Sequence, residues 1–187
     1  GASTVGDFNG DGYADLAMGA PLDFGDLGAV HIFYGRADGL GAGVPEQVLS
    51  GTDGPMPLFG AALSGAGDLN GDGYNDLVVG APRAMGAGRV YVFNGGPQGL
   101  GEMPSAVLSA PGLADARFGG AVAEVGDLDG DGDTDLVVGA ENAVSFTGRT
   151  FVFLGDRAGV ARTPTLTLTY PVGGQFGASV TALGDAN

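Results

Sequence analysis

The chain has 187 residues, of which 44% are hydrophobic, so it is long enough and apolar enough to form one compact core. It carries 22 acidic residues against 7 arginines and no lysine, and its net charge of −15 argues against nucleic acid and anionic membrane surfaces as partners. The sequence has no cysteine, which excludes disulfides and thiolate metal sites, and its apolar runs are far too short for direct membrane insertion.

An acidic loop of nine residues recurs along the chain, as DFNGDGYAD at 7–15, DLNGDGYND at 68–76 and DLDGDGDTD at 127–135. A fourth copy begins at Asp185 and stops at Asn187, so no metal is assigned to it. Each complete loop has carboxylate or amide oxygens at positions 1, 3, 5 and 9 and glycine at position 6. Because calcium prefers about six to eight oxygen ligands, this pattern predicts three Ca2+ sites.

The segments between the loops also repeat in a fixed order. They are short runs rich in Val, Phe, Leu and Tyr and bounded by Gly, Pro and Asp, which indicates β-strands. No segment keeps a helical period, so we expect almost no helix. The predicted strands are 61–67, 121–126 and 178–184 before a loop, 15–21, 76–82 and 135–141 after one, then 29–35, 89–95 and 149–155, and finally 47–51, 106–110 and 165–170.

Four short antiparallel strands per repeat are typical of a β-propeller blade. We therefore predict an all-β fold with about three blades, at residues 1–58, 59–117 and 118–175, and the first strand of a next blade at 176–187. The small residues of the segments before each loop suit the crowded innermost strand. Because propellers typically need about four to eight blades to close, we expect a partial propeller, either cut from a larger one or completed by further copies of the chain.

Two short motifs, one dipeptide and one tripeptide, flank the loops. Phe-Gly precedes a loop at 59–60, 118–119 and 176–177, and Gly-Ala-Pro follows one at 19–21 and 80–82. With these motifs the chain resembles the FG-GAP repeats of the integrin alpha-subunit β-propeller and its bacterial and fungal relatives. The resemblance implies a ring of seven blades, calcium loops between the first and second strands on one face, and partners that often bind on the other face. The third repeat departs from the pattern, since Glu141 replaces the proline.

The resemblance also implies a ligand set for each calcium ion. Positions 1, 3, 5 and 9 would donate side-chain oxygens and position 7 its backbone carbonyl. The predicted ligands are Asp7, Asn9, Asp11, Tyr13 and Asp15 in the first loop, Asp68, Asn70, Asp72, Tyr74 and Asp76 in the second, and Asp127, Asp129, Asp131, Asp133 and Asp135 in the third. We expect the third loop to bind calcium most tightly, because Asp129 replaces an asparagine there.

Other interpretations of the acidic residues are weaker. An EF-hand needs glutamate at position 12, where this chain has Met18, Val79 and Val138. The single histidine, His31, aligns with Tyr91 and Phe151 in the sister repeats, which indicates a strand side chain packed between sheets. No nucleophile elbow or zinc-protease motif is present, and nearly all clustered carboxylates are assigned to metal. The sequence therefore predicts a protein that is not an enzyme.

The function predicted from the sequence is a calcium-stabilised interaction or adhesion module, extracellular or at a cell surface. Absence of cysteine and of N-glycosylation sequons favours a bacterial origin. Two alternatives stay open, a lectin-type propeller that binds glycans and a non-catalytic domain of a secreted enzyme. The partner, a protein or a glycan, should contact loops that differ between repeats. Those loops, at 22–28, 83–87, 141–147, 52–58, 111–117 and 171–175, hold Asp23, Asp26, Met56, Arg83, Asp115, Arg117, Glu141 and Asn142.

Overall fold

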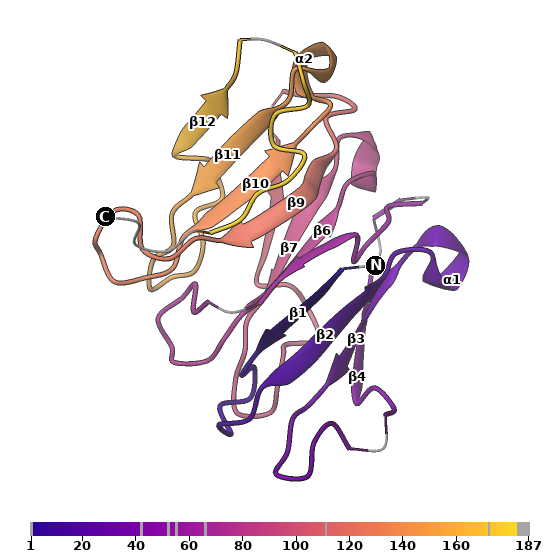
Figure 1. Ribbon diagram of the computed structural model, residues 1–187, viewed down its shortest axis with the longest axis vertical. Helices are drawn as coiled ribbons and strands as arrows, with labels where there is room; N and C mark the ends of the chain where they lie inside the picture. Colours follow the sequence, from indigo (N-terminus) through magenta and orange to yellow (C-terminus); the bar gives the residue numbers. More distant parts are fainter. Residues whose placement is uncertain are drawn as a thin grey trace.

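The computed structural model describes residues 2–41, 43–51, 53–54, 56–65, 67–110, 112–171 and 173–182. These residues form three four-stranded antiparallel sheets that follow one another in chain order (Figure 1). The predicted all-β fold of propeller blades is therefore confirmed. Helix is limited to the single turns α1 (Asp23–Asp26), η1 (Ala84–Gly86) and α2 (Ala143–Phe146), each with residues of positive φ inside.

Within each sheet the strands pair in sequence order, as a meander. The first sheet contains β1 (Ser3–Gly6), β2 (Asp15–Ala20), β3 (Ala29–Phe33) and β4 (Gln47–Ser50). The second contains β5 (Ala62–Ser64), β6 (Leu77–Ala81), β7 (Arg89–Phe93) and β8 (Ala106–Ser109). The third contains β9 (Phe118–Glu124), β10 (Leu136–Ala140), β11 (Arg149–Phe153) and β12 (Leu166–Thr169). The blade boundaries at 58, 117 and 175 stay a prediction.

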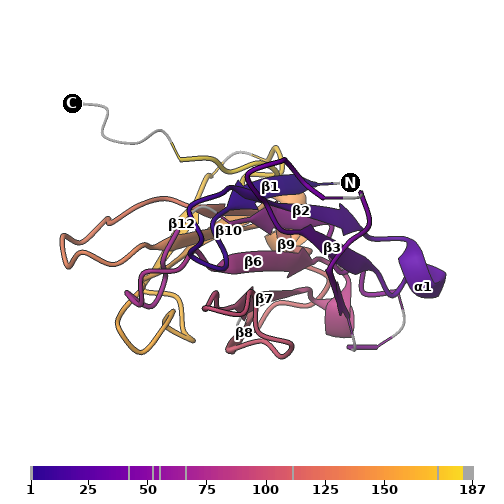
Figure 2. The same ribbon diagram turned by 90° about the horizontal axis from the view of Figure 1, so that it is seen from below.

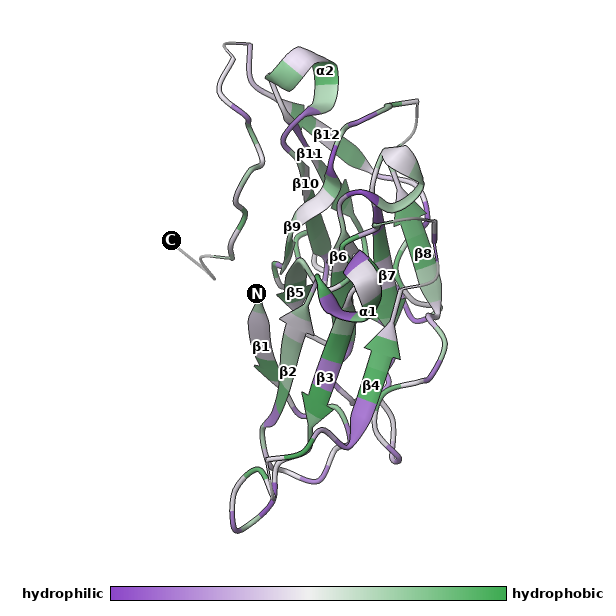
Figure 3. Cartoon of the chain, turned by 90° about the vertical axis from the view of Figure 1, so that its right-hand side faces the viewer, coloured by the Kyte–Doolittle hydropathy of each residue, from purple (hydrophilic) through white to green (hydrophobic). Residues whose placement is uncertain are grey.

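The second sheet lies between the other two and is covered on both faces. Every residue of β6 is buried, because successive side chains of a strand point to opposite faces and each face meets a neighbouring sheet. Val79 belongs to a core shared with the first sheet, whereas Val78 belongs to a core shared with the third. By contrast, all four residues of β12 are exposed. Figure 3 shows hydrophobic residues along most of the strands and hydrophilic ones in the connecting loops.

The innermost strands adjoin one another, since β5 contacts both β1 and β9. The small residues of these segments suit that close approach, as the sequence indicated. The antiparallel order also sets the two ends of each sheet apart. Loops from the first to the second strand leave at one end, and loops from the second to the third strand leave at the other. Figure 2 shows this separation, with α1 opposite the loop between β9 and β10.

The Phe-Gly motifs join each blade to the one before it. Phe59 is 1% exposed and packs edge-on against Tyr91 and Phe93, with ring centroids 5.3 and 6.1 Å apart. Its backbone N–H donates to the carbonyl of Leu27 in the first blade at 3.3 Å. Phe118 repeats the arrangement one blade later, with centroid distances of 5.6 and 6.0 Å to Phe151 and Phe153. One aromatic ring thus closes each interface between blades.

The glycine of the Gly-Ala-Pro motif belongs to the same seam. A Cβ on Gly19 would overlap the carbonyl oxygen of Gly60, and a Cβ on Gly80 would overlap that of Gly119. The two motifs are therefore halves of one contact: the Phe-Gly carbonyl of one blade lies against the Cα of the glycine in the preceding blade. A side chain at that glycine would separate the blades.

One predicted strand is wrong in its described part. Residues 178–182 form no strand, and 183–184 lie outside the described residues. The physical reason is the lack of a partner, because the innermost strand pairs with the strand after its acidic loop and none of the described residues supplies that strand here. Phe176 nevertheless takes its place in the seam, where its N–H donates to the carbonyl of Thr147 at 3.0 Å.

Candidate metal centres

Each complete acidic loop joins the innermost strand of a sheet to the second strand. The first runs from the end of β1 to the start of β2, the second from β5 to β6 and the third from β9 to β10. All three leave the sheets at the same end, because the strands of successive sheets run in equivalent directions. The fourth copy, at Asp185 to Asn187, lies outside the described residues.

Backbone N–H groups hold the first three acidic or amide side chains of the first loop. Asp7 accepts hydrogen bonds from the N–H of Asp11 at 3.1 Å and of Gly12 at 3.0 Å. Asn9 Oδ1 accepts from the Asp11 N–H at 3.0 Å, and Asp11 Oδ1 accepts from the Tyr13 N–H at 2.9 Å. The loop backbone therefore fixes these oxygens in one cluster, and each oxygen keeps a second lone pair.

The same four hydrogen bonds recur in the other two loops. Their lengths are 3.1, 2.8, 3.1 and 3.0 Å in the second loop and 3.1, 2.9, 3.3 and 3.0 Å in the third. In the third loop the carboxylate oxygens of Asp127, Asp129 and Asp135 lie within 4.8 Å of one another. Three carboxylates at this separation repel unless a cation or a proton lies between them.

The aspartate at position 9 is fully buried in each loop. Asp15, Asp76 and Asp135 are 0% exposed. Oδ2 of Asp15 accepts from the N–H of Phe8, at position 2, at 2.8 Å, and Oδ1 accepts from the N–H of Gly35 at 2.8 Å. Asp76 and Asp135 make the equivalent pairs of bonds. Each of these carboxylates therefore ties its loop to the end of the third strand of the same blade.

The sequence interpretation missed this second role of position 9. A signal was present, because a glycine ends each predicted third strand, at 35, 95 and 155. A Cβ on Gly35 would overlap the carbonyl oxygen of Ala14, the residue just before Asp15. Only glycine lets the strand end come close enough to donate its N–H to the buried carboxylate.

Burial and neighbouring charges shift several of these carboxyl groups. Burial raises the pKa of Asp76 to about 6, although the N–H groups of Gly95 and Leu69 act in the opposite direction and the charges of Asp72 and Asp68 add to the rise. Burial likewise raises the pKa of Asp15. Desolvation and the adjacent charge of Asp131 raise the pKa of Asp129, whereas the N–H groups of Gly132 and Gly130 lower that of Asp127.

The donor set fits calcium. It consists of oxygens alone, most of them carboxylate, held on a short loop whose backbone is already shaped around them. The carbonyls of Tyr13, Tyr74 and Asp133, predicted as further ligands, belong to residues whose N–H groups complete the hydrogen-bond pattern. Their role in coordination stays a prediction, as does the full ligand set of each loop.

Comparison with known proteins identifies the repeat. The family model described as FG-GAP repeat matches residues 1–33, 59–93 and 118–153, which together make up more than half of the chain. The chain belongs to the FG-GAP repeat family. The matched stretches each contain an acidic loop and its flanking strands, and two of them begin at the Phe-Gly motif of Phe59 or Phe118. The resemblance drawn from the motifs is confirmed.

Curated relatives of this FG-GAP repeat chain include integrin alpha subunits. Integrin alpha-PS3 of Drosophila melanogaster is 38% identical over 73% of this chain, and integrin alpha-IIb of Homo sapiens is 39% identical over 74% of it. Integrin alpha-7 of Homo sapiens is 36% identical over 84% of the chain. The FG-GAP chain spans only 13% to 14% of the length of these relatives.

The single histidine of the FG-GAP chain has an ordinary surface contact. His31 lies on β3, partly exposed, and its Nε2 is 3.0 Å from Oδ2 of Asp23. Its counterparts Tyr91 and Phe151 are buried. The predicted packing of His31 itself between sheets is not seen, because its side chain is partly exposed beside Asp23. Among the described residues, no helix is long and apolar enough to cross a membrane.

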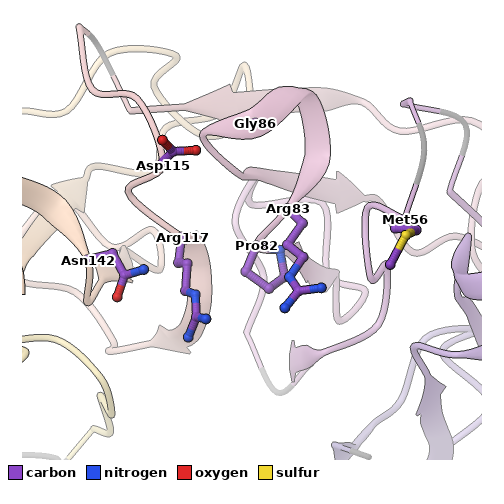
Figure 4. Close-up of a pocket in the computed structure, with 7 residues that line it drawn as sticks. All are labelled: Met56, Pro82, Arg83, Gly86, Asp115, Arg117 and Asn142. Carbon is purple, nitrogen blue, oxygen red and sulfur yellow. The ribbon is translucent and has the colours of Figure 1, made fainter.

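The variable loops of the FG-GAP chain meet at the end opposite the acidic loops. Five of the eight candidate contact residues surround one pocket of about 360 Å³, together with Pro82 and Gly86 (Figure 4). They are Met56, Arg83, Asp115, Arg117 and Asn142. Glu141 lies beside it on a second pocket of about 190 Å³ and pairs with Arg117 at 2.7 Å. Asp23 and Asp26 lie apart from both pockets, on α1 of the first blade.

Proposed function

We propose that this chain is a calcium-stabilised, non-enzymatic interaction module of an extracellular or cell-surface protein. One observation carries the proposal: the three loops, which vary only at positions 2, 3, 7 and 8, make the same set of backbone hydrogen bonds around the same oxygen positions. Acidic surface turns have no reason to share that geometry, whereas loops built for one kind of ion do. We propose one calcium ion in each loop, held by the ligands predicted above.

In this proposal the loops stabilise the arrangement of the strands that they connect. Bound calcium would supply positive charge that offsets the repulsion between neighbouring carboxylates. Asp7 and Asp11 face the ion from the turn, and Asp15 connects the turn to the end of β3 through Gly35. The loop thereby fixes the hairpin between β1 and β2 against the third strand of the same blade. This is a structural role, consistent with four or five protein ligands on a tight turn.

We propose that a protein ligand binds at the opposite end, where the loops differ between repeats. The relatives are named as integrin alpha subunits, which favours an adhesion-type partner for this chain. Sugar recognition usually employs aromatic side chains, and the described lining of the 360 Å³ pocket at that end has none. Two alternatives remain without a supporting observation: a glycan ligand, and a place as a non-catalytic domain of a secreted enzyme. The bacterial origin also stays a prediction, since the relatives named above are animal proteins.

Both outer faces of the three-sheet array are apolar. Val5, Met18 and Val48 of the first sheet are 55%, 45% and 44% exposed. Leu166, Leu168 and Tyr170, on and just after β12, are 52%, 40% and 57% exposed. Equivalent faces of the second sheet are buried against neighbours. We propose that further blades, or another copy of this chain, cover these two faces.

A calcium titration tests the proposed loops. Isothermal titration calorimetry of the chain should show three equivalents of calcium, and Asp11→Ala, Asp72→Ala or Asp131→Ala should each remove one. These position-5 residues are exposed, so their loss does not open the core. The matched control is Asp38→Ala, an exposed acidic residue outside the loops, which should keep all three equivalents. Calcium binding that is absent, or indifferent to the position-5 variants, would overturn the proposal.

A further inference from the structure

The largest concentration of positive charge at the variable end lies in the pocket between the second and third sheets. Arg83, in the loop between β6 and β7, and Arg117, just before β9, line both the 360 Å³ pocket and the 190 Å³ pocket beside it. Figure 4 shows the two side chains extending in the same direction, on either side of Pro82. The whole chain has only 7 arginines and no lysine, so placing two cations on one pocket is a marked departure from its composition.

The Arg83 guanidinium is exposed and makes no ion pair with any residue that the structure describes. Its backbone is fixed, because its N–H donates to the carbonyl of Pro57 at 3.2 Å. By contrast, Arg36 pairs with Glu46, and Arg89 pairs with Asp53 at 2.6 Å. Arg83 therefore offers a free planar donor group on an anchored loop, the geometry that carboxylates recognise.

Arg117 is positioned by a residue that breaks the repeat pattern. Glu141 stands where the first two repeats have Pro21 and Pro82, and Arg117 stands where the neighbouring repeats have Leu58 and Gln175. These two departures contact each other, since Arg117 Nη1 donates to Glu141 Oε1 at 2.7 Å. The pair leaves the other guanidinium N–H groups of Arg117 for a ligand. Arg117 and Glu141 therefore form a contact that is specific to the boundary between the second and third blades and is not part of the repeated scaffold.

The rest of the lining suits one carboxylate on an aliphatic stem. Met56 and Pro82 supply apolar surface, and Asn142 supplies an amide whose nitrogen lies on the side of Arg117 (Figure 4). The Asn142 backbone is anchored, as its N–H donates to the carbonyl of Ala116 at 3.1 Å. Asp115, exposed on the same lining, repels additional anionic groups and so favours a ligand with a single carboxylate.

The overall charge restricts the ligand further. With a net charge of −15, the chain repels polyanions such as sulfated glycans or nucleic acid over a range of about 8 Å at physiological salt. A single carboxylate can still bind, because Arg83 and Arg117 line the same pocket and a carboxylate there would meet both at short range. A pocket of about 360 Å³ also lies at the small end of ligand sites, which matches one side chain better than a chain of sugars.

We propose that the Arg83–Arg117 pocket binds the carboxylate of an aspartate or glutamate side chain of a partner protein. This rests on the proposed function, in which the variable end contacts a protein ligand, and it names the chemistry of that contact. Arg83 and the free face of Arg117 clamp the carboxylate, Glu141 orients Arg117, and Met56 and Pro82 pack against the stem of the side chain.

The test uses a blocked amino acid as the probe. N-acetylglutamate methylamide is titrated into the calcium-saturated, 15N-labelled protein, and the arginine Nε–Hε signals are followed by NMR. We expect the Arg83 and Arg117 signals to shift and to saturate, whereas the uncharged N-acetylglutamine methylamide should leave them in place. Arg83→Gln should weaken probe binding about tenfold or more, since it removes a charge-assisted bidentate contact. Arg36→Gln makes the same charge change at a distant ion pair and should keep the affinity.

Three outcomes of the NMR titration would overturn the inference. They are equal shifts with the glutamine probe, shifts at Arg36 as large as those at Arg83, or no shift of either pocket arginine. Tighter binding of free glucuronic acid than of the glutamate probe would reassign the pocket to acidic sugars and also reject it. Calcium stoichiometry is measured on the same sample, so failure of the proposed calcium module can be told apart from failure of this pocket.

Discussion

Asp7 and Asn75 hold each other at two points across the boundary between the first and second blades. The N–H of Asp7 donates to Oδ1 of Asn75 at 2.8 Å, and the N–H of Asn75 donates to the carbonyl of Asp7 at 3.1 Å. Asp7 is position 1 of the first acidic loop and Asn75 is position 8 of the second. Neighbouring acidic loops are thus joined directly. The next boundary has only the backbone half of this contact, from the Thr134 N–H to the Asp68 carbonyl at 3.3 Å.

Replacing Asn75 with alanine should therefore weaken the first loop as well as the second blade. The change removes one partly buried hydrogen bond, with a loss of unfolding free energy of about 1 kcal/mol. The calcium affinity of the first loop should fall, because Asp7 loses the contact that orients its backbone. Site-resolved calcium titration at the Gly12 amide, with urea unfolding, measures both effects. Thr134→Ala is the matched control, and equal effects of the two variants would contradict the coupling.

Asp129 should make the third loop the tightest calcium site. It supplies a carboxylate where the first two loops have Asn9 and Asn70, and it lies within 4.8 Å of Asp127 and Asp135. Asp129→Asn should lower the affinity of the third loop to that of its siblings and reduce its dependence on salt. The amides of Gly12, Gly73 and Gly132 report the three loops separately in a calcium titration. If the third loop is no tighter than the others before the substitution, the prediction is wrong.

The second loop should lose calcium as the pH falls through about 6. Burial raises the pKa of Asp76 to about 6, so a proton competes with the ion below that pH. Without calcium, the effect of pH on stability is opposite: protonation of Asp76 favours the folded state. The folded state then binds the proton more tightly than the unfolded state does, and the Asp76 contribution to stability declines as pH rises from about 4 to about 6.

Thermal unfolding in chelator, for the protein and for Asp76→Asn, measures this contribution as a difference between the two chains. The asparagine variant carries no titrating group at that position, so it serves as the reference at each pH. The protein should lose stability relative to the variant between pH 4 and pH 6. A gain over that interval would rule out the raised pKa as the cause.

The glycine of the Gly-Ala-Pro motif should tolerate no side chain. A Cβ on Gly80 would overlap the carbonyl oxygen of Gly119, so Gly80→Ala must push the second and third blades apart, at a cost of about 2 kcal/mol or more. Gly96→Ala is the control, because its Cβ would meet nothing closer than 3.8 Å. Urea unfolding should show a large loss for the first variant and almost none for the second.

The motifs were predictable from the sequence, but the contacts that explain them were not. Phe-Gly and Gly-Ala-Pro could be recognised as paired signals, yet only the fold shows that the Gly60 carbonyl rests on Gly19 of the preceding blade. The contact joins residues about forty positions apart, and no local pattern reports it. Position 9 was likewise predicted as a ligand while its bond to the end of the third strand went unseen.

The contact made by the residue at position 8 of a loop could not be predicted for a different reason. The residues at this position differ between loops, as Ala14, Asn75 and Thr134, so repetition gave no cue to the contact with the neighbouring loop. The Arg117–Glu141 pair is the opposite case, because both residues stood out as departures from the repeat. Their contact still depends on two loops whose relative placement the sequence does not state.

Asp53 should control the ionisation of Tyr91 across the first blade boundary. Its Oδ2 accepts from the Tyr91 hydroxyl at 2.5 Å and from Arg89 Nη1 at 2.6 Å. Burial first, and the Asp53 hydrogen bond and charge next, raise the pKa of Tyr91, while the bond from Tyr91 lowers that of Asp53. In Asp53→Asn, the Tyr91 pKa should fall toward its ordinary value without reaching it, because burial remains. Alkaline titration of phenolate absorbance follows this directly, with Glu141→Gln at the Arg117 pair as the control. An unchanged tyrosine titration in Asp53→Asn would mean that burial alone holds the hydroxyl proton of Tyr91.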